Sequence, residues 1–160
     1  MIHTIVVDAL NYLSRFVPCE EERFRGGKPA ALIVQARARV NEFSDALRAK
    51  NITAYFVFDN GQATEEANEK WLERRQKEVE MGVRSMPANA EVHLMAILEE
   101  EGWTVLFPSG IDGDDAVARL AMKLDCHVVS RDQDMMRYGL PRGRVLTGER
   151  PYPNPSPNPN

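Results

Sequence analysis

The chain has 160 residues, of which 43% are hydrophobic and 28% are charged, a balance typical of one globular domain and not of a disordered or fibrous chain. The net charge of −4 argues mildly against a dedicated nucleic-acid-binding protein, although basic patches and an acidic metal site can coexist in one molecule. The sequence shows no membrane-spanning apolar run, no signal-type start, no disulfide framework and no zinc-binding spacing. We therefore expect an intracellular, cytoplasmic protein with no membrane partner.

The first predicted strand is the apolar segment HTIVVDAL, which ends near Asp8. A short helix or turn is expected at NYLSRF, followed by an exposed loop at PCEEERFRGGKP, where a Gly-Gly pair and a proline interrupt regular structure. Apolar residues at helical spacing predict a helix over residues 30–50. A second buried strand is expected at ITAYFVFD, and it also ends in an aspartate, Asp59.

The second half of the chain continues the same alternation. After a turn at NGQAT, helices are expected at EEANEKWLERRQKEVEM and, beyond Pro87, at ANAEVHLMAILEEEG. A third strand at WTVLFP, a helix at DGDDAVARLAMKL and a fourth strand at CHVVS follow, and GRVLTG is expected to form a short fifth strand. Strands that alternate with helices predict an α/β fold with a central, mostly parallel sheet of about five strands flanked by helices.

The last segment, PYPNPSPNPN, is too rich in proline and asparagine to form a core. We therefore expect a single folded domain over residues 1–148 and a disordered tail over residues 149–160.

Acidic residues follow each of the first four predicted strands. They are Asp8, Asp59, the group Asp112, Asp114 and Asp115, and the pair Asp132 and Asp134. Because the carboxyl ends of parallel strands meet at one edge of the sheet, these carboxylates are expected to converge on one pocket. Two carboxylates about 4 Å apart repel by roughly 4 kcal/mol at an effective dielectric of about 20. Such a pocket must take up protons, spread apart or bind cations.

Oxygen ligands without cysteine or histidine are typical of Mg²⁺ or Mn²⁺ sites. Two such ions about 3.5–4 Å apart stabilise both the attacking and the leaving oxygen of a phosphodiester, and no serine, cysteine or histidine nucleophile is then needed. The acids at the strand ends therefore favour metal-dependent phosphodiester chemistry.

Each acidic segment also has a purely structural interpretation. Asp112 can cap the following helix, and Asp114 and Asp115 can complement its dipole, which stabilises a helix by about 1 kcal/mol. Asp132 can cap the turn that begins at Gln133 in the same way. The DGDD segment also resembles the start of a calcium loop, but the glutamate expected further on is absent. The acidic metal site is nevertheless favoured, because aspartates follow four successive strands and all are expected at the same edge of the sheet.

Four segments in this order resemble the motifs of the PIN-like superfamily, and within it those of the flap endonuclease and five-prime nuclease branch. The segments are VVDALNYLSRF, VFDNG, GIDGDDAVARLA and VVSRDQDMMRYG, and they span residues 5–139. The resemblance implies a three-layer PIN-like fold that hydrolyses phosphodiester bonds with two Mg²⁺ or Mn²⁺ ions, acting on nucleic acid, with DNA favoured over RNA.

The resemblance also assigns the acids to roles in catalysis and metal binding. It implies that Asp8, Asp59, Asp112 and Asp114 serve a first ion, that Asp132 and Asp134 serve a second, and that Asp115 lies close to both groups. In this sequence Asp112 replaces the more usual glutamate of the family, so its carboxylate is one methylene shorter and its ion is expected to shift or to bind through water.

A basic helix that contacts the scissile phosphate follows the second motif in the family, and KWLERRQKE occupies that place here. The resemblance therefore implies phosphate contacts from Lys70, Arg74 and Arg75. The alternative is that Glu69 and Glu73 pair with these residues on a solvated face, which contributes only a few tenths of a kcal/mol per pair.

Further phosphate contacts are expected outside this helix. One is expected from Arg15, which follows Asp8 in the first motif. The loop EEERFRGGK is a candidate substrate gate, with Arg23, Arg25 and Lys28 on phosphates and Phe24 stacked on a base, although such a segment is more often only an exposed loop.

Two other functions remain open. After Gly139 the sequence has no further acidic segment and no Gly-rich helix-hairpin-helix, so a PIN-like module that binds nucleic acid or a protein partner without turnover is the main alternative. A phosphatase acting on small phosphate esters ranks last. It would need an Asp-x-Asp motif after the first strand, whereas Ala9 and Leu10 follow Asp8.

Overall fold

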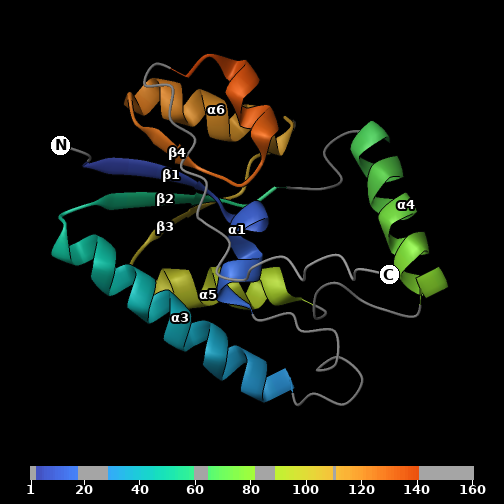
Figure 1. Ribbon diagram of the computed structural model, residues 1–160, viewed down its shortest axis with the longest axis horizontal. Coiled ribbons are helices and arrows are strands. Elements are labelled where there is room, and N and C mark those ends of the chain that lie inside the picture. The colour runs from blue at the N-terminus through green and yellow to red at the C-terminus, as the bar shows by residue number, and fades with distance from the viewer. Residues whose placement is uncertain (1–2, 18–28, 60–64, 82–88, 110, 141–160) are drawn as a thin grey trace, which may run out of the picture.

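The computed structural model describes residues 3–17, 29–59, 65–81, 89–109 and 111–140. Its strands are β1 (Thr4–Asp8), β2 (Thr53–Val57), β3 (Thr104–Leu106) and β4 (His127–Val129). They form one sheet in the order β3-β2-β1-β4, and each neighbouring pair is parallel (Figure 1). The predicted parallel α/β sheet is confirmed, but within the described residues it has four strands and not about five. The segment expected to form the fifth, residues 143–148, lies outside the described residues, as do the predicted loop 18–28 and the tail 149–160.

The helices lie close to the predicted ranges, except that the first helix already begins at Ala9, within the segment assigned to the first strand, and that a 3₁₀ helix forms where only a turn from Gln133 was expected. They are α1 (Ala9–Phe16), α3 (Pro29–Ala49), α4 (Glu65–Met81), α5 (Ala90–Glu100), α6 (Gly113–Leu124) and a 3₁₀ helix, η1 (Gln133–Tyr138). After α5, Gly102 has a φ of 81°, a left-handed conformation that glycine adopts without steric cost, and this ends the helix before β3 begins.

The sheet separates two hydrophobic cores. Ile5 and Val7 of β1 pack with Phe56 into the core shared with α1, α3 and α5, whereas Val6 packs with Val117 into the core beneath α6. Successive strand residues point to opposite faces, so a strand covered on both faces is apolar along its buried middle, as Ile5, Val6 and Val7 of β1 are. Figure 1 shows the result, with α6 on one side of the sheet and α3 and α5 on the other.

Strand order creates a reversal at β1. The chain moves from β1 to β2 and β3 in one direction, then returns to place β4 on the other side of β1. In open α/β sheets, ligands bind beyond the carboxyl ends of the strands where the order reverses. Asp8, the last residue of β1, lies at this point.

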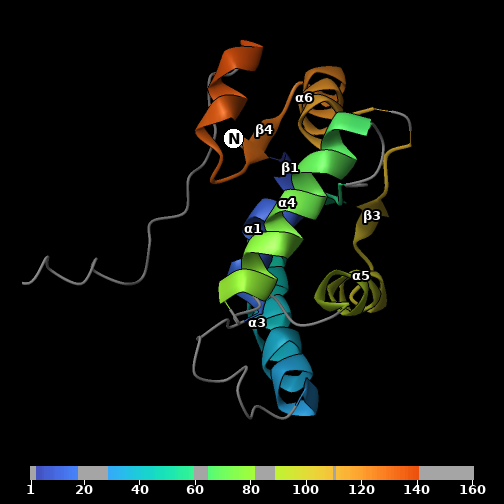
Figure 2. The same ribbon diagram turned by 90° about the vertical axis from the view of Figure 1, so that its right-hand side faces the viewer.

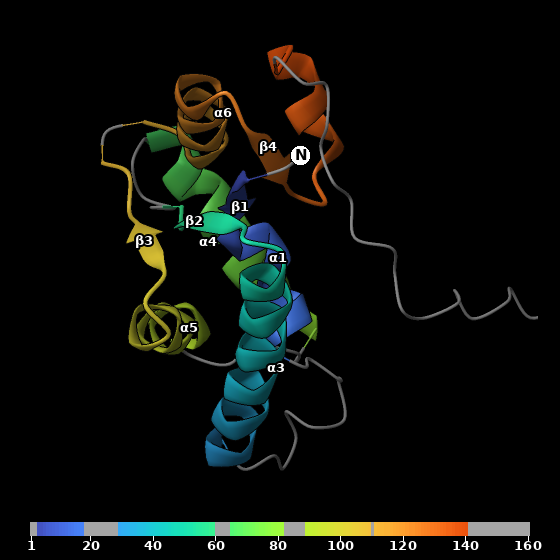
Figure 3. The ribbon, with the colours of Figure 1, turned by 90° about the vertical axis from the view of Figure 1, so that its left-hand side faces the viewer.

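Helix α4 stands apart from the two layers. It makes no extensive contact with any other described element. Figure 2, seen from the side toward which the strands run, shows α4 in front of β1 and α1, whereas Figure 3 shows the opposite edge of the sheet. The charged helix therefore lies across the edge that carries the acids. No helix in the described part of the chain is both long and apolar enough to cross a membrane.

Candidate functional site

Asp8 is the buried end of the site, with only 9% of its surface exposed. The hydroxyl of Ser130 donates to Asp8 Oδ2 at 2.7 Å, and the backbone N–H of Asn11 donates to Asp8 Oδ1 at 3.2 Å. Burial raises the pKa of Asp8, and the nearby charges of Asp132 and Asp59 raise it further, while the two hydrogen bonds oppose this. The carboxylate is thus held in one orientation beside other negative charges.

Asp59 follows β2 and packs against the start of α6. A Cβ atom placed on Gly113 would lie 2.6 Å from Asp59 Cγ, so only glycine allows this close approach. Burial raises the pKa of the Asp59 carboxyl, as does the charge of Asp112, while Arg74 and the backbone N–H of Gly113 lower it. The second motif and the third motif therefore meet through direct contact.

Asp112 caps α6, as its structural interpretation predicts. Its Oδ1 accepts a hydrogen bond of 3.0 Å from the backbone N–H of Asp114. Asp114 itself lies among the acids. Burial and then the charges of Asp8, Asp112 and Asp132 raise its pKa to about 6, and Arg137 opposes the shift. Capping and membership of an acidic site are therefore compatible at this helix start.

Asp132 likewise caps a helix and belongs to the acidic site. Its Oδ1 accepts from the backbone N–H of Asp134 at 2.8 Å, which caps η1, and its own N–H donates to Ser130 Oγ at 3.0 Å. Its charge raises the pKa of both Asp8 and Asp114. Asp132 is thus joined to Asp8 through Ser130 and contributes negative charge to the same site.

Asp134 and Asp115 have other partners. Asp134 Oδ2 lies 3.8 Å from Arg137 Nη1, and Asp115 Oδ1 accepts a hydrogen bond of 2.8 Å from the Tyr138 hydroxyl. The structure therefore places Asp8, Asp59, Asp112, Asp114 and Asp132 within range of mutual electrostatic repulsion. Asp115 and Asp134 instead contact side chains of η1.

The donor set fits a hard divalent cation in chemistry, because it consists of carboxylates whose mutual repulsion a cation would relieve. The described residues do not contain three or more Asp, Glu, His or Cys side chains already gathered around one point that an ion would occupy. Ion binding therefore requires the carboxylates to draw together from the spread arrangement seen here.

Two cations of α4 face the acids. The charge of Arg74 lowers the pKa of Asp59. The pKa of Lys70 is raised first by Glu66, its partner at 2.7 Å, and also by Asp112. Residues four apart share one face of a helix. Lys70 and Arg74 therefore form one basic stripe that points toward the sheet edge.

Arg75 lies on a different side of α4. It pairs with Glu78 at 2.9 Å, and its guanidinium lies 5.6 Å from the centre of the Trp71 ring. Ion pairing within the helix is confirmed for Lys70 and Arg75, although the partners are Glu66 and Glu78 and not the predicted Glu69 and Glu73.

The other predicted phosphate contacts are far less defined. Arg15 lies in the last turn of α1, and its carbonyl oxygen accepts a hydrogen bond of 3.0 Å from Arg39 of α3. Arg25 and the rest of the predicted gate, Arg23, Phe24 and Lys28, lie outside the described residues.

Sequence reasoning overlooked the residues that hold the acids in place. Ser130 joins Asp8 to Asp132, and Asn11 Oδ1 accepts from the backbone N–H of Arg131 at 2.7 Å, which ties α1 to the end of β4. The Ser-x-Asp spacing was a usable signal for Ser130, because serine two residues before an N–H commonly bonds to it. Nothing local indicated the partner of Asn11, which is far away in sequence.

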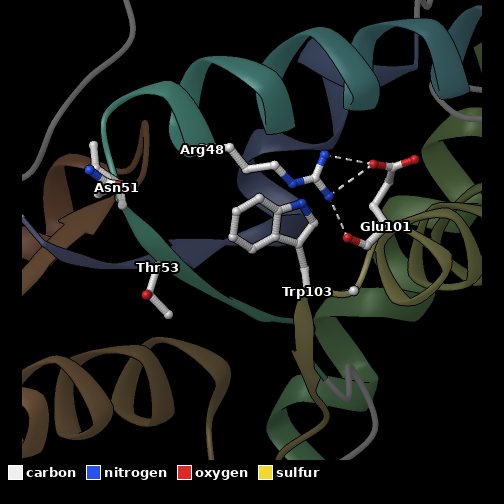
Figure 4. Close-up of a pocket in the computed structure, with 7 residues that line it drawn as sticks. Arg48, Asn51, Thr53, Glu101 and Trp103 are labelled. Atoms are coloured by element: carbon white, nitrogen blue, oxygen red, sulfur yellow. Dashed lines mark hydrogen bonds and ion pairs between the residues drawn. The ribbon is translucent and has the colours of Figure 1, made fainter.

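A shallow groove lies at the opposite edge of the sheet (Figure 4). There the guanidinium of Arg48 stacks 5.4 Å from the Trp103 ring centre and donates to Glu101 Oε2 at 3.1 Å. These groups satisfy one another, and the groove is separated from the acids by the length of the strands.

No protein-family model matches the sequence, and no curated protein is significantly similar to it. Among solved structures, the chain is similar to the catalytic core of Rad2 in complex with a DNA substrate, with a TM-score of 0.53 and 15% identity over 86% of this chain. It is also similar to the T5 D15 protein co-crystallised with metal ions, with a TM-score of 0.48 and 18% identity over 84% of this chain. The chain spans 40% and 50% of the lengths of those two structures. The similarity to the Rad2 core shows that the chain shares the fold of that catalytic core, which agrees with the fold that the motif resemblance implies.

Proposed function

We propose that this protein is a Mg²⁺- or Mn²⁺-dependent nuclease that hydrolyses phosphodiester bonds of nucleic acid, with DNA favoured over RNA. The observation that carries the proposal is the placement of Asp8, Asp59 and Asp114 at the carboxyl edge of the sheet, where burial and nearby carboxylates raise their pKa values. Perturbed carboxylates gathered at such an edge are typical of functional sites. The solved structure of the Rad2 core, which has the same fold, is a complex with a DNA substrate.

The acids with raised pKa values are the natural ligands. Asp8, Asp59 and Asp114 would hold the ion, with Asp112 and Asp132 adding negative charge around it. A bound divalent ion would offset the repulsion among the carboxylates and stabilise negative charge that develops on the phosphate oxygens. Ser130 and Asn11 keep Asp8 in the orientation that binding requires. The binding of two ions stays a prediction. Of the acids expected to hold the second ion, Asp132 caps η1 and Asp134 lies beside Arg137.

The basic stripe of α4 would bind the nucleic-acid backbone. Lys70 and Arg74 lie within electrostatic range of Asp112 and Asp59, so a phosphate seated between helix and acids would meet positive charge from one side. This arrangement would bring the scissile phosphate to the ion and keep its position while the bond breaks.

The test uses the intact chain with labelled single-stranded, flapped and duplex DNA and with RNA, in Mg²⁺, in Mn²⁺ and in EDTA. We expect metal-dependent cleavage that Asp114→Asn, Asp112→Ala and Asp132→Ala abolish. Asp45→Asn, a change at an exposed aspartate of α3, is the matched control and should cleave normally. Equal cleavage by all four variants would reject the proposal.

One observation favours a second candidate, a binding module without turnover. Among the described residues, no three or more carboxylates are already arranged around one point that an ion could occupy. In that case the same substrates would bind, with an affinity that falls as salt rises, but EDTA and Asp114→Asn would change nothing. Binding without metal-dependent products in the assay above would favour this module over the nuclease.

A further inference from the structure

Trp71 lies on α4 beside the basic stripe of Lys70 and Arg74, and 40% of its surface is exposed. It comes three residues before Arg74, and residues three or four apart are neighbours on the surface of a helix. Tryptophan is a residue that folded proteins mostly bury. Because α4 makes no extensive contact with any other described element, packing within the fold does not cover this ring. The indole therefore stands in water next to the cations that face the acids.

One side of the Trp71 ring is held by the helix itself. The guanidinium of Arg75 lies over the ring, 5.6 Å from its centre, and Arg75 is held in turn by the largely buried carboxylate of Glu78 at 2.9 Å. A cation over an indole face attracts the ring and limits its motion. No second aromatic ring packs on Trp71 in the part of the chain that the structure describes. The exposed part of the indole is therefore pre-oriented and open to a flat group.

We propose that Trp71 stacks on an unpaired base of the bound nucleic acid while Lys70 and Arg74 contact phosphates of the same strand, so that α4 favours unpaired over duplex nucleic acid. This inference rests on the nucleic-acid binding that both proposed functions share, and not on catalysis. Stacking on an aromatic side chain accepts every base, since each base has a π face. The bases of a duplex already stack on one another and are not open to the ring. A strand that crosses the basic stripe would bring its bases beside Trp71, because Trp71 borders Arg74 on the helix surface.

The chain contains two tryptophans, which makes a fluorescence test specific. Trp103 lies at the opposite edge of the sheet, where its indole N–H donates to Ser44 Oγ at 2.7 Å. Trp103→Phe leaves Trp71 as the only tryptophan, and a single-stranded oligonucleotide added in EDTA should quench its emission, because a stacked base quenches indole fluorescence. Trp71→Phe leaves only Trp103 and should show no quenching. Unquenched Trp71 emission in a complex whose formation is confirmed by fluorescence anisotropy would overturn the inference.

Binding affinity supplies a second measurement on the intact chain. Trp71→Ala should weaken binding of a single strand roughly 5- to 100-fold, the loss expected for one base–aromatic stack, and Trp71→Phe should keep most of the affinity. The salt slope should not change, since no charge is removed. Leu72→Ala is the matched control, because Leu72 is an apolar neighbour on the same helix with 52% of its surface exposed. Equal losses in Trp71→Ala and Leu72→Ala, or an equal loss on a strand of abasic sites, would show that no base is recognised.

The outcomes separate this inference from the proposed nuclease. Quenching of Trp71 in EDTA, with no cleavage in Mg²⁺ or Mn²⁺, would support the inference and reject the nuclease. Metal-dependent cleavage with unquenched Trp71 emission would do the reverse. Trp71 emission that changes with protein concentration in the absence of nucleic acid would assign the ring to a contact between two copies of the chain, and would overturn the inference as well.

Discussion

Ser130 and Asp8 are joined by a buried hydrogen bond of 2.7 Å, from the serine hydroxyl to Oδ2 of the aspartate, across the point where β4 returns beside β1. The bond fixes the carboxylate that ends β1 at the reversal of strand order. Because Ser130 Oγ also accepts from the N–H of Asp132, one hydroxyl links the first and the fourth acidic segments. The site is therefore built on a contact between residues 122 positions apart.

Ser130→Ala is expected to destabilise the protein by about 1–3 kcal/mol, the usual effect of leaving a buried polar group without its partner. The pKa of Asp8 should rise further, since the lost bond favours the ionised form. Urea unfolding monitored by circular dichroism gives the free energy of unfolding, with Ser109→Ala, at an exposed serine, as control. A free energy equal to that of the control would mean that the bond contributes nothing.

The raised pKa of Asp114 predicts how the free energy of unfolding changes with pH in the absence of metal. Its pKa is raised from 3.8 to about 6, so the folded state binds the proton more tightly than the unfolded state. The stabilising contribution is therefore complete below pH 3.8 and is lost as the pH rises through about 6. In EDTA, the wild-type protein should lose stability relative to Asp114→Asn between these pH values.

Metal affinity should change in the opposite direction over the same window. If Asp114 binds the proposed ion, the proton and the cation compete for its carboxylate, so Mn²⁺ binding should strengthen as the pH rises through about 6. Mn²⁺ at 100 times its dissociation constant should stabilise the fold by about 2.7 kcal/mol. Thermal melts with and without Mn²⁺ at several pH values measure both effects. A Mn²⁺ shift that is the same at pH 5 and pH 8 would exclude Asp114 as a ligand.

Gly113→Ala should impair cleavage more than folding. The new Cβ would lie 2.6 Å from Asp59 Cγ and force the carboxylate out of position. A displacement of about 1 Å in a catalytic group can reduce the rate on the order of 100-fold. Rate measurements at saturating Mn²⁺, with a thermal melt to confirm folding, test this. Normal cleavage by Gly113→Ala would show that the position of Asp59 is not critical.

The face of α4 predicts which cations bind nucleic acid. Lys70→Gln and Arg74→Gln should each weaken DNA binding and reduce the salt slope by about one, as expected when one phosphate contact is lost. Arg75→Gln is a matched control on the same helix, because Arg75 is held by Glu78 and Trp71. Fluorescence anisotropy over a range of salt concentrations measures both quantities. Equal losses in all three variants would assign the effect to overall charge and not to the basic stripe.

The sequence by itself determined the order of elements and the edge on which the acids gather. Apolar runs of strand length that alternate with helical patterns produce a parallel sheet, and parallel strands bring Asp8 and the later aspartates to one end. The caps at Asp112 and Asp132 were also predictable, because a cap depends only on residues within one turn of helix. These features follow from local chemistry and from the direction of the chain.

Only the tertiary structure decided which charges act together. Burial raises the pKa of Asp114, Gly113 approaches Asp59, and Tyr138 holds Asp115, and each of these depends on segments far apart in sequence. The rotation of α4 about its axis likewise separates Arg74 from Arg75, which are neighbours in the chain. Electrostatic energies depend on distance and on exposure to water, and both are properties of the packed molecule that no local pattern encodes.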